Sequence, residues 1–267
     1  MRKTFTLLYY VPLGSTIALT PLFFILLHRG GVETPNLGVF PEGGVGPLLN
    51  AVLWVSVTAF FGLMLIFLVR KSADVLRGFI IALSIYTILA ISLFYLDILF
   101  SFGVALTLSL LTASLSLYSL IKRRYTLLYS VILLTVMVGL GIIFNASFEE
   151  MTKVAVLVVY SLFDIYSVYK GMLKVMFEER EAALRLLDPL LIRFGPLALG
   201  VGDVIFYSLL LSYALETAYA LFLPASISLT LGHTANLWIL RQRRIIPALP
   251  LPVVLTLAVI LAYRVLC

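Results

Sequence analysis

Long apolar runs dominate this sequence, and they leave few architectures open to it. Hydrophobic residues make up 62% of the 267 residues and charged residues only 12%. A helical run of about 20 apolar residues matches the thickness of a bilayer core. Because a backbone in lipid must satisfy its own hydrogen bonds, such runs predict membrane helices. We therefore expect an all-α polytopic membrane protein that forms a single membrane domain over residues 1–267.

Short polar or charged segments divide the apolar residues into nine runs, which predict nine transmembrane helices. Six spans fall within residues 1–169 and three within 196–267, and residues 170–195 form the longest polar connection. Residues 178–185 of that connection are expected to be helical, since Glu181 and Arg185 are four residues apart. The predicted spans cover residues 5–27, 48–69, 79–96, 98–120, 125–144, 151–169, 196–211, 218–240 and 245–263.

Basic residues alternate between the connections. From the second connection to the eighth, the numbers of Lys and Arg are three, zero, three, one, five, zero and three. Cytoplasmic loops collect Lys and Arg, so nine spans predict a cytoplasmic N-terminus and a C-terminus outside the cell membrane. The formal net charge of +6 then reflects topology, and no nucleic-acid partner is expected.

Two aspartates stand inside apolar runs: Asp164 in the sixth and Asp203 in the seventh. A charged side chain at the bilayer centre costs at least about 2.5 kcal/mol, so an intramembrane acid is a functional candidate by default. With a helical rise of about 1.5 Å per residue, both acids lie roughly 9–10 Å from the cytoplasmic end of adjacent, antiparallel spans. At matching depth, two carboxyl groups can share one proton, activate water and polarise an amide carbonyl.

Glycines and prolines mark two segments that could serve these acids. Gly200 and Gly202 remove side-chain bulk beside Asp203, which lets a backbone or a substrate come close. The ninth run opens with Ile246-Pro-Ala-Leu-Pro-Leu-Pro252, and three alternate prolines prevent a regular helix there. This segment begins near the cytoplasmic face and could border a cavity or pair with an extended substrate. A kinked helix start is the simpler interpretation.

Two aspartates alone do not identify the chemistry. Intramembrane acids more often belong to ion or proton pathways, so a proton- or cation-coupled transporter is the main alternative. A transporter is expected to contain inverted repeats and a site at the bilayer midplane, whereas we find no clear repeat and the acids lie off-centre. A prepilin-type peptidase also uses Gly-x-Gly-Asp, but it usually continues with Lys where this chain has Ile205, and it leaves the proline segment unexplained.

The remaining polar residues suggest structural roles. Asn50, His233 and Asn236 are expected to form interhelical hydrogen bonds of about 0.6 kcal/mol each, and Asp97 and Glu216 to lie in solvated turns. Gly139-Leu-Gly141 is expected to be a packing face. No His, Asp and Glu cluster has metal-ligand spacing, and the single cysteine is the last residue, so we expect neither a metal nor another cofactor.

The order of the motifs is distinctive. An aspartate late in the sixth run, Gly-x-Gly-Asp over residues 200–203 and Pro-Ala-Leu over 247–249 resemble the presenilin / signal peptide peptidase family of GxGD intramembrane aspartyl proteases. The resemblance implies a presenilin-like fold and an endopeptidase that cleaves within transmembrane segments. It implies that Asp164 and Asp203 form the catalytic dyad, that Gly200 and Gly202 shape the site, and that Pro247, Ala248 and Leu249 position substrate.

Further expectations follow from the same resemblance. Phe163 stands where the family usually has Tyr, so the hydroxyl beside the first aspartate is absent and the ring is kept. The predicted orientation is that of presenilins, which implies single-span type I membrane proteins as substrates. The connection over residues 170–195 is much shorter than the long processed loop of animal presenilins, so we expect no self-cleavage. No large extracellular loop offers a docking site, and the chain is similar to the compact archaeal members of the family, so we expect no obligate accessory subunits.

Overall fold

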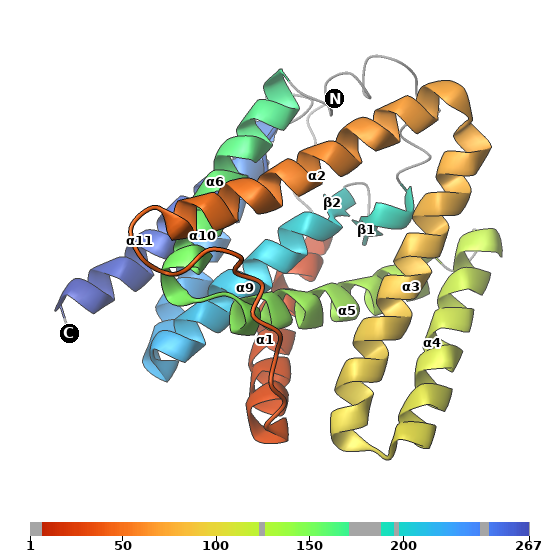
Figure 1. Cartoon of the computed structure of the whole chain (residues 1–267), viewed down its shortest axis with the longest axis horizontal. Coiled ribbons are helices and arrows are strands. Elements are labelled where there is room, and N and C mark those ends of the chain that lie inside the picture. Colours follow the sequence, from red (N-terminus) through yellow and green to blue (C-terminus); the bar gives the residue numbers. More distant parts are fainter. Residues whose placement is uncertain (1–6, 123–125, 171–187, 195–197, 241–245, 267) are drawn as a thin grey trace.

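The computed structural model describes residues 7–122, 126–170, 188–194, 198–240 and 246–266 (Figure 1). The described residues form nine long α-helices, three short 3-10 turns and one small sheet. The helices are α1 (Val11–Gly30), α2 (Gly46–Lys71), α3 (Ala73–Leu99), α4 (Phe102–Lys122), α5 (Thr126–Ser147), α6 (Glu150–Tyr169), α9 (Val201–Thr217), α10 (Phe222–Leu240) and α11 (Pro250–Leu266). The 3-10 turns are η1 (Leu7–Tyr10), η2 (Asp188–Leu190) and η3 (Tyr219–Leu221), and the strands are β1 (Leu191–Arg193) and β2 (Ala198–Gly200).

Each predicted span corresponds to one of these helices, and six of them, α1 to α6, are long and apolar enough to cross a membrane. Among the other three, α9 and α11 have only 17 residues each. Large apolar side chains such as Phe60, Phe67 and Leu110 are exposed on the helices, as is expected where lipid replaces water. The chain is an integral multi-pass membrane protein.

Several helix boundaries differ from the prediction. The helix α3 continues through Asp97 to Leu99, so the turn expected at Asp97 lies at Phe100 and Ser101. The seventh helix begins at Val201 rather than near residue 196, and the ninth begins at Pro250 rather than 245. In the ninth, the prolines delay the helix because each lacks the N–H that a helix interior requires.

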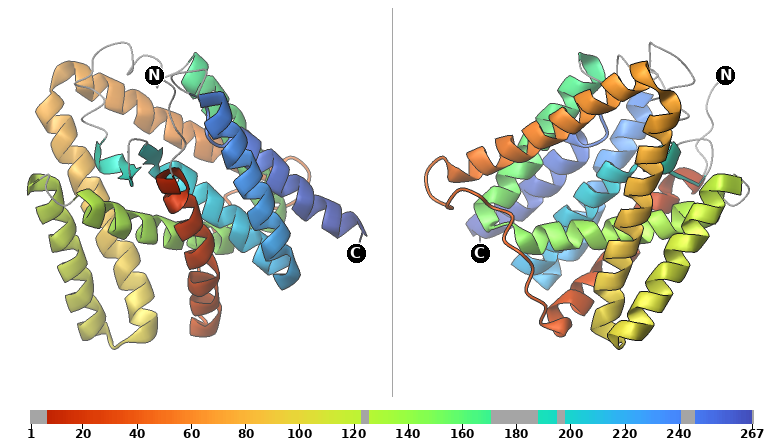
Figure 2. Two further views of the ribbon diagram at one scale, coloured as in Figure 1. Left: turned by 180° about the vertical axis from the view of Figure 1, so that it is seen from behind. Right: turned by 45° about the vertical axis from the view of Figure 1, so that its right-hand side comes forward.

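The helix α9 lies in the centre of the bundle, in contact with α1, α5, α10 and α11 (Figures 1 and 2). Every residue from Phe206 to Leu215 is buried. A helix that is apolar on all sides needs neighbours on all sides, and α9 therefore forms the core of the protein. The antiparallel pair α3 and α4 stands at one edge of the bundle.

The packing face predicted at Gly139-Leu-Gly141 is observed. At Gly141 of α5, a Cβ atom would overlap the hydroxyl of Ser208 and the carbonyl of Ile205, both on α9. At Gly139, a Cβ atom would meet the ring of Tyr95 from α3. These contacts let α5 approach both helices closely, as small residues do in membrane bundles.

The connection before α9 contains a small antiparallel sheet, which the all-α prediction missed. Strands β1 and β2 pair Leu191 with Gly200, Ile192 with Leu199 and Arg193 with Ala198. The hairpin is anchored on α5, where the Ser130 hydroxyl accepts the Arg193 N–H at 3.0 Å. The helix predicted over residues 178–185 lies outside the described residues.

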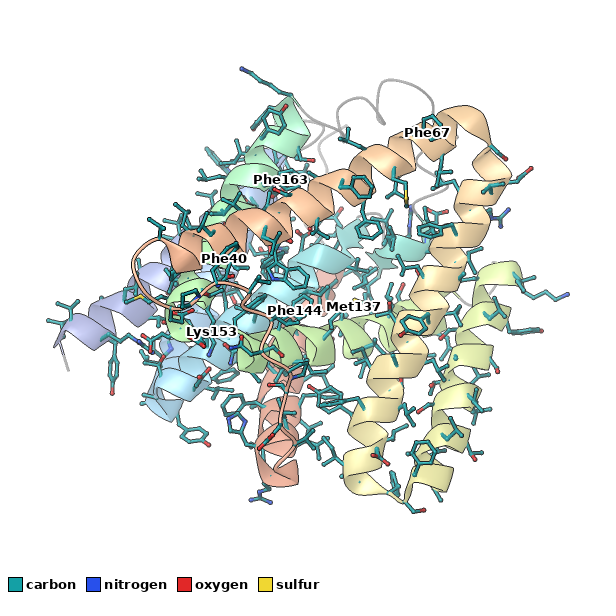
Figure 3. The ribbon with its side chains drawn as sticks, viewed as in Figure 1. Phe40, Phe67, Met137, Phe144, Lys153 and Phe163 are labelled. Carbon is teal, nitrogen blue, oxygen red and sulfur yellow. The ribbon has the colours of Figure 1, made fainter. Side chains whose placement is uncertain are left out.

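A charged cluster joins α6 to α9 at the end of α6 opposite to Phe163 (Figure 3). Lys153 is buried and donates to both carboxylate oxygens of Glu216, at 2.8 and 2.7 Å. Asn145 of α5 donates to the same carboxylate at 2.7 Å. Glu216 is exposed, as predicted. The sequence did not predict its ion pair, because Lys153 had been assigned to the connection before the sixth span and lies inside the bundle.

Candidate functional site

Asp203 occupies the first turn of α9, directly after β2. Gly200 is the last residue of β2 and the N-cap of α9, and its backbone N–H donates to the Asp203 carboxylate at 3.2 Å. A Cβ atom at Gly200 would lie 3.3 Å from that carboxylate, whereas a Cβ atom at Gly202 would meet open space. Of the two glycines, Gly200 therefore leaves room for the Asp203 carboxylate. Gly200 does so from an extended conformation, not from within the predicted helix.

Asp164 projects from the last two turns of α6 toward the segment before α11. Its carboxylate accepts the backbone N–H of Leu249 at 3.0 Å, and the Ala248 backbone also hydrogen-bonds to it. Phe163, the neighbouring residue on α6, is half-buried. The Asp164 side chain is therefore tied directly to the predicted Pro-Ala-Leu segment.

The Pro247-Ala248-Leu249 segment has no helical or strand structure and is held by side chains from two helices. The Ala248 carbonyl accepts a hydrogen bond from Asn236 of α10 at 2.6 Å and one from the Tyr207 hydroxyl of α9 at 3.2 Å. The Ala248 carbonyl is thus bonded on one side of the segment, and the N–H groups of Ala248 and Leu249 donate to Asp164 on the other. These hydrogen bonds satisfy backbone polar groups that have no helical partners, because the prolines prevent a helix here.

The structure brings the two predicted aspartates together. Asp164 and Asp203 lie close enough for direct electrostatic interaction, and both interact with Tyr207. Two carboxyl groups that interact in one site can share a single proton. Asp164, Asp203 and the segment before α11 therefore belong to one site between α6 and α9.

A cavity of about 290 Å³ opens beside Asp203. Phe194 and Leu199 from the hairpin border it, as do Asn236 of α10 and Ala248. Apolar walls with a few convergent polar groups are typical of a ligand-binding or active site. Among the described residues, no three His, Cys, Asp or Glu side chains gather as metal ligands would.

The sequence did not identify the residues that hold this site in place. Asn236 was expected to form an ordinary interhelical hydrogen bond, and no role was predicted for Tyr207. The available signal was a polar group inside an apolar run, but the partner of such a group depends on tertiary contacts. The pairing of Asn50 with Thr152 between α2 and α6, at 3.2 Å, is of the expected interhelical kind.

The fold and the acidic pair define a class: a polytopic helical membrane protein with two half-buried carboxyl groups among its helices. Two solved structures share the fold, each described as a presenilin family intramembrane aspartate protease, in space groups C222 and P2. The first is 19% identical with a TM-score of 0.65, and the alignment covers 96% of this chain and all of that one. The second is 18% identical with a TM-score of 0.66 and coverages of 96% and 98%.

By sequence, no family model and no curated protein matches this chain. The structural likeness extends over nearly the whole chain and confirms the presenilin-like fold that the motifs implied.

Proposed function

We propose that this protein is an intramembrane aspartyl endopeptidase that hydrolyses peptide bonds within transmembrane segments of other membrane proteins. The observation that carries the proposal is the pairing of Asp164 with Asp203 against the Pro-Ala-Leu backbone. The fold shared with presenilin-family proteases supports it. Phe163, Gly200 and Gly202 shape the site, and Pro247, Ala248 and Leu249 position the substrate. No cofactor takes part.

The two aspartates divide the chemistry between them. The ionised carboxylate removes a proton from water as the water oxygen attacks the amide carbon, and the protonated carboxyl gives its proton to the carbonyl oxygen. Collapse of the tetrahedral intermediate breaks the C–N bond, and the departing nitrogen takes a proton from the carboxyl that abstracted one. A hydroxyl of the intermediate returns its proton to the other carboxylate as the product carbonyl forms. The products are a carboxylic acid and an amine, and the pair again holds one proton.

An apolar groove offers the substrate a route to this pair. It has a volume of about 290 Å³ and lies between α6 and α11, with Ile165 and Pro250 among its lining residues. Ile165 follows Asp164, and Pro250 follows the Pro-Ala-Leu segment, so a transmembrane helix in the groove would lie next to the site. We assign the groove to a single-span type I segment, in keeping with the predicted orientation.

The substrate must be extended where it is cut, because a helical amide is hydrogen-bonded and shielded. The small sheet supports this step. Only one edge of β2 is paired within the described residues, with β1. An unwound substrate segment adding to the other edge would place its amides beside Asp203, as in strand addition generally.

Cleavage of a type I transmembrane peptide by the purified protein in bilayers, followed by mass spectrometry, tests the proposal. We expect cuts inside the apolar segment, and a fall in rate of roughly 10²–10⁴-fold or more in both Asp164→Asn and Asp203→Asn. Both variants should fold, since Asn keeps the shape of Asp and removes one of two like charges from the site. Asp97→Asn, at an exposed acid of α3, is the matched control and should cleave normally.

Either of two results would contradict the assignment. Full proteolysis in Asp164→Asn would exclude the paired aspartates as the catalytic groups. No cleavage across several peptides, combined with proton flux into vesicles that requires both aspartates, would establish the transporter instead.

A further inference from the structure

A second cavity, of about 200 Å³, lies at the ends of α3, α4 and α5, away from the two aspartates. Its lining includes Arg77 in the second turn of α3, Ser119 in the last turn of α4 and Thr126, the first residue of α5. Arg193 of β1 closes the cavity from the hairpin side. All three helices are membrane spans by length and composition, so the cavity lies where spans end and lipid headgroups begin.

The charge and the free donors of this cavity suit an anion. Of the described residues that line it, Arg77 and Arg193 are positive and Asp188 is negative. Arg193 pairs with Asp188 at 2.6 Å, whereas half-buried Arg77 has no ion pair with any described residue. Thr126 stands at the positive end of the α5 dipole, which favours negative charge. A guanidinium fork binds phosphate oxygens in pairs.

We propose that this cavity binds the phosphate group of an anionic membrane lipid. The predicted topology places the cavity on the cytoplasmic side, where basic pockets between helices bind anionic headgroups. A soluble phosphate ion presents the same oxygens and is the alternative ligand for this cavity. The lipid is favoured because the cavity opens at the ends of membrane spans, where headgroups are concentrated.

The cavity is connected to the candidate active site through the hairpin. The Tyr129 hydroxyl of α5 donates to the Pro189 carbonyl at 2.6 Å, and Ser130 holds the Arg193 N–H. Leu191 of β1 pairs with Gly200 of β2, whose N–H donates to Asp203. An anion in the cavity, which Leu191 and Arg193 of β1 line, would therefore lie against the strands that place Asp203. This regulatory part rests on the proposed proteolysis, whereas binding of the lipid does not.

Native mass spectrometry of the purified protein in neutral detergent measures binding without reference to proteolysis. Phosphatidylglycerol should bind the native chain and Arg29→Gln alike and bind Arg77→Gln roughly tenfold more weakly, which corresponds to the loss of one charge-assisted hydrogen bond. Arg29 is the control because it is an exposed arginine at the end of α1. Arg77→Lys keeps the charge without the fork and should bind with intermediate affinity. Equal affinity in all four proteins would overturn the site.

Two further experiments distinguish lipid phosphate from soluble phosphate as the ligand, and lipid binding from proteolysis. Displacement of phosphatidylglycerol by millimolar inorganic phosphate would assign the cavity to the soluble anion, and retention would assign it to the lipid. In vesicles, phosphatidylglycerol should change the cleavage rate of the native chain relative to phosphatidylcholine, and Arg77→Gln should abolish that difference while keeping the basal rate. Lipid binding with no cleavage in any vesicle would retire the proposed function and leave the lipid site standing.

Discussion

At the scale of single residues, the Ala248 carbonyl of the candidate site is held in place by two side-chain hydrogen bonds. It accepts from Asn236 and from Tyr207, and the N–H groups of the same segment donate to Asp164. A backbone without secondary structure keeps its position only if side chains hold it. Under the proposed function, Asn236 and Tyr207 would be positioning residues, which act on the chemistry through the Pro-Ala-Leu segment.

Asn236→Leu should lower the cleavage rate at saturating substrate, because the Ala248 carbonyl loses its shorter hydrogen bond. A lost bond of this kind costs about 1–3 kcal/mol. Tyr207→Phe should have a smaller effect, and the two changes should not be additive, since they act on one carbonyl. Kinetics of both single variants and the double variant measure this. Thr230→Val, which removes a bond inside α10, is the control, and an equal loss there would refute the positioning role.

The pair Lys153 and Glu216 predicts an asymmetry in stability. The side chain of Lys153 is only 4% exposed and that of Glu216 is 42% exposed. Glu216→Ala leaves a buried ammonium unpaired and should cost roughly 1–3 kcal/mol, less than for a fully buried pair because water screens Glu216. Lys153→Met leaves an acid that water can solvate, so it should cost less. Thermal unfolding in detergent orders the two, and a larger loss in Lys153→Met would contradict this account.

At the scale of helices, the contact between α5 and α9 decides where Asp203 lies. Because α9 is buried on all sides, its position depends on how closely its neighbours approach. The absence of a side chain at Gly141 allows the backbone of α9 to lie against α5 near Ile205 and Ser208. Asp203 is two residues before Ile205, so a shift of α9 at this contact moves the carboxylate.

Gly141→Ala should therefore destabilise the protein by about 1–3 kcal/mol, as overpacking does, and should reduce cleavage. Gly14→Ala in α1 is the matched control, since nothing lies within 4 Å of an added Cβ there, and alanine favours a helix by about 0.4–1 kcal/mol. Unfolding temperatures and cleavage rates of the two variants make the comparison. A stable, fully active Gly141→Ala would show that this contact can relax.

At the scale of the whole molecule, the distribution of basic residues bears on the orientation in the membrane. The alternation of basic residues predicts a cytoplasmic N-terminus and an exterior C-terminus. Of the five basic residues between the sixth and seventh spans, Lys170 and Arg193 are the described ones, and Arg193 lies in the hairpin next to the site. The orientation therefore also decides on which side of the membrane the products are released.

The single cysteine allows a direct test. A membrane-impermeant maleimide added to intact cells should label Cys267 of the native chain. It should label Lys122→Cys, in a Cys267→Ser background, only after the cells are permeabilised. Lys122 is exposed at the end of α4, on the predicted cytoplasmic side. The reverse labelling pattern would invert the topology and the expected substrate class.

The sequence by itself determined which segments form helices. Hydrophobicity, spacing and rise per residue act along one chain segment, and these local quantities predicted that Asp164 and Asp203 lie at matching depth. The same local signals marked the prolines that keep residues 247–249 out of α11.

Only the tertiary structure decided which side chains meet. Rotation of α6 and α9, the pairing of Lys153 with Glu216, and the hold of Asn236 on Ala248 depend on helices distant in sequence. The sequence did not predict the hairpin, because strands of three residues are too short to show an alternating pattern of apolar and polar residues. The position of β1 depends instead on a tertiary contact, the hydrogen bond from its Arg193 N–H to Ser130 of α5. The depth of a residue follows from the rise per residue along its own helix. The rotation of each helix about its axis, and the side chains that it meets, depend on the packing of all the helices together.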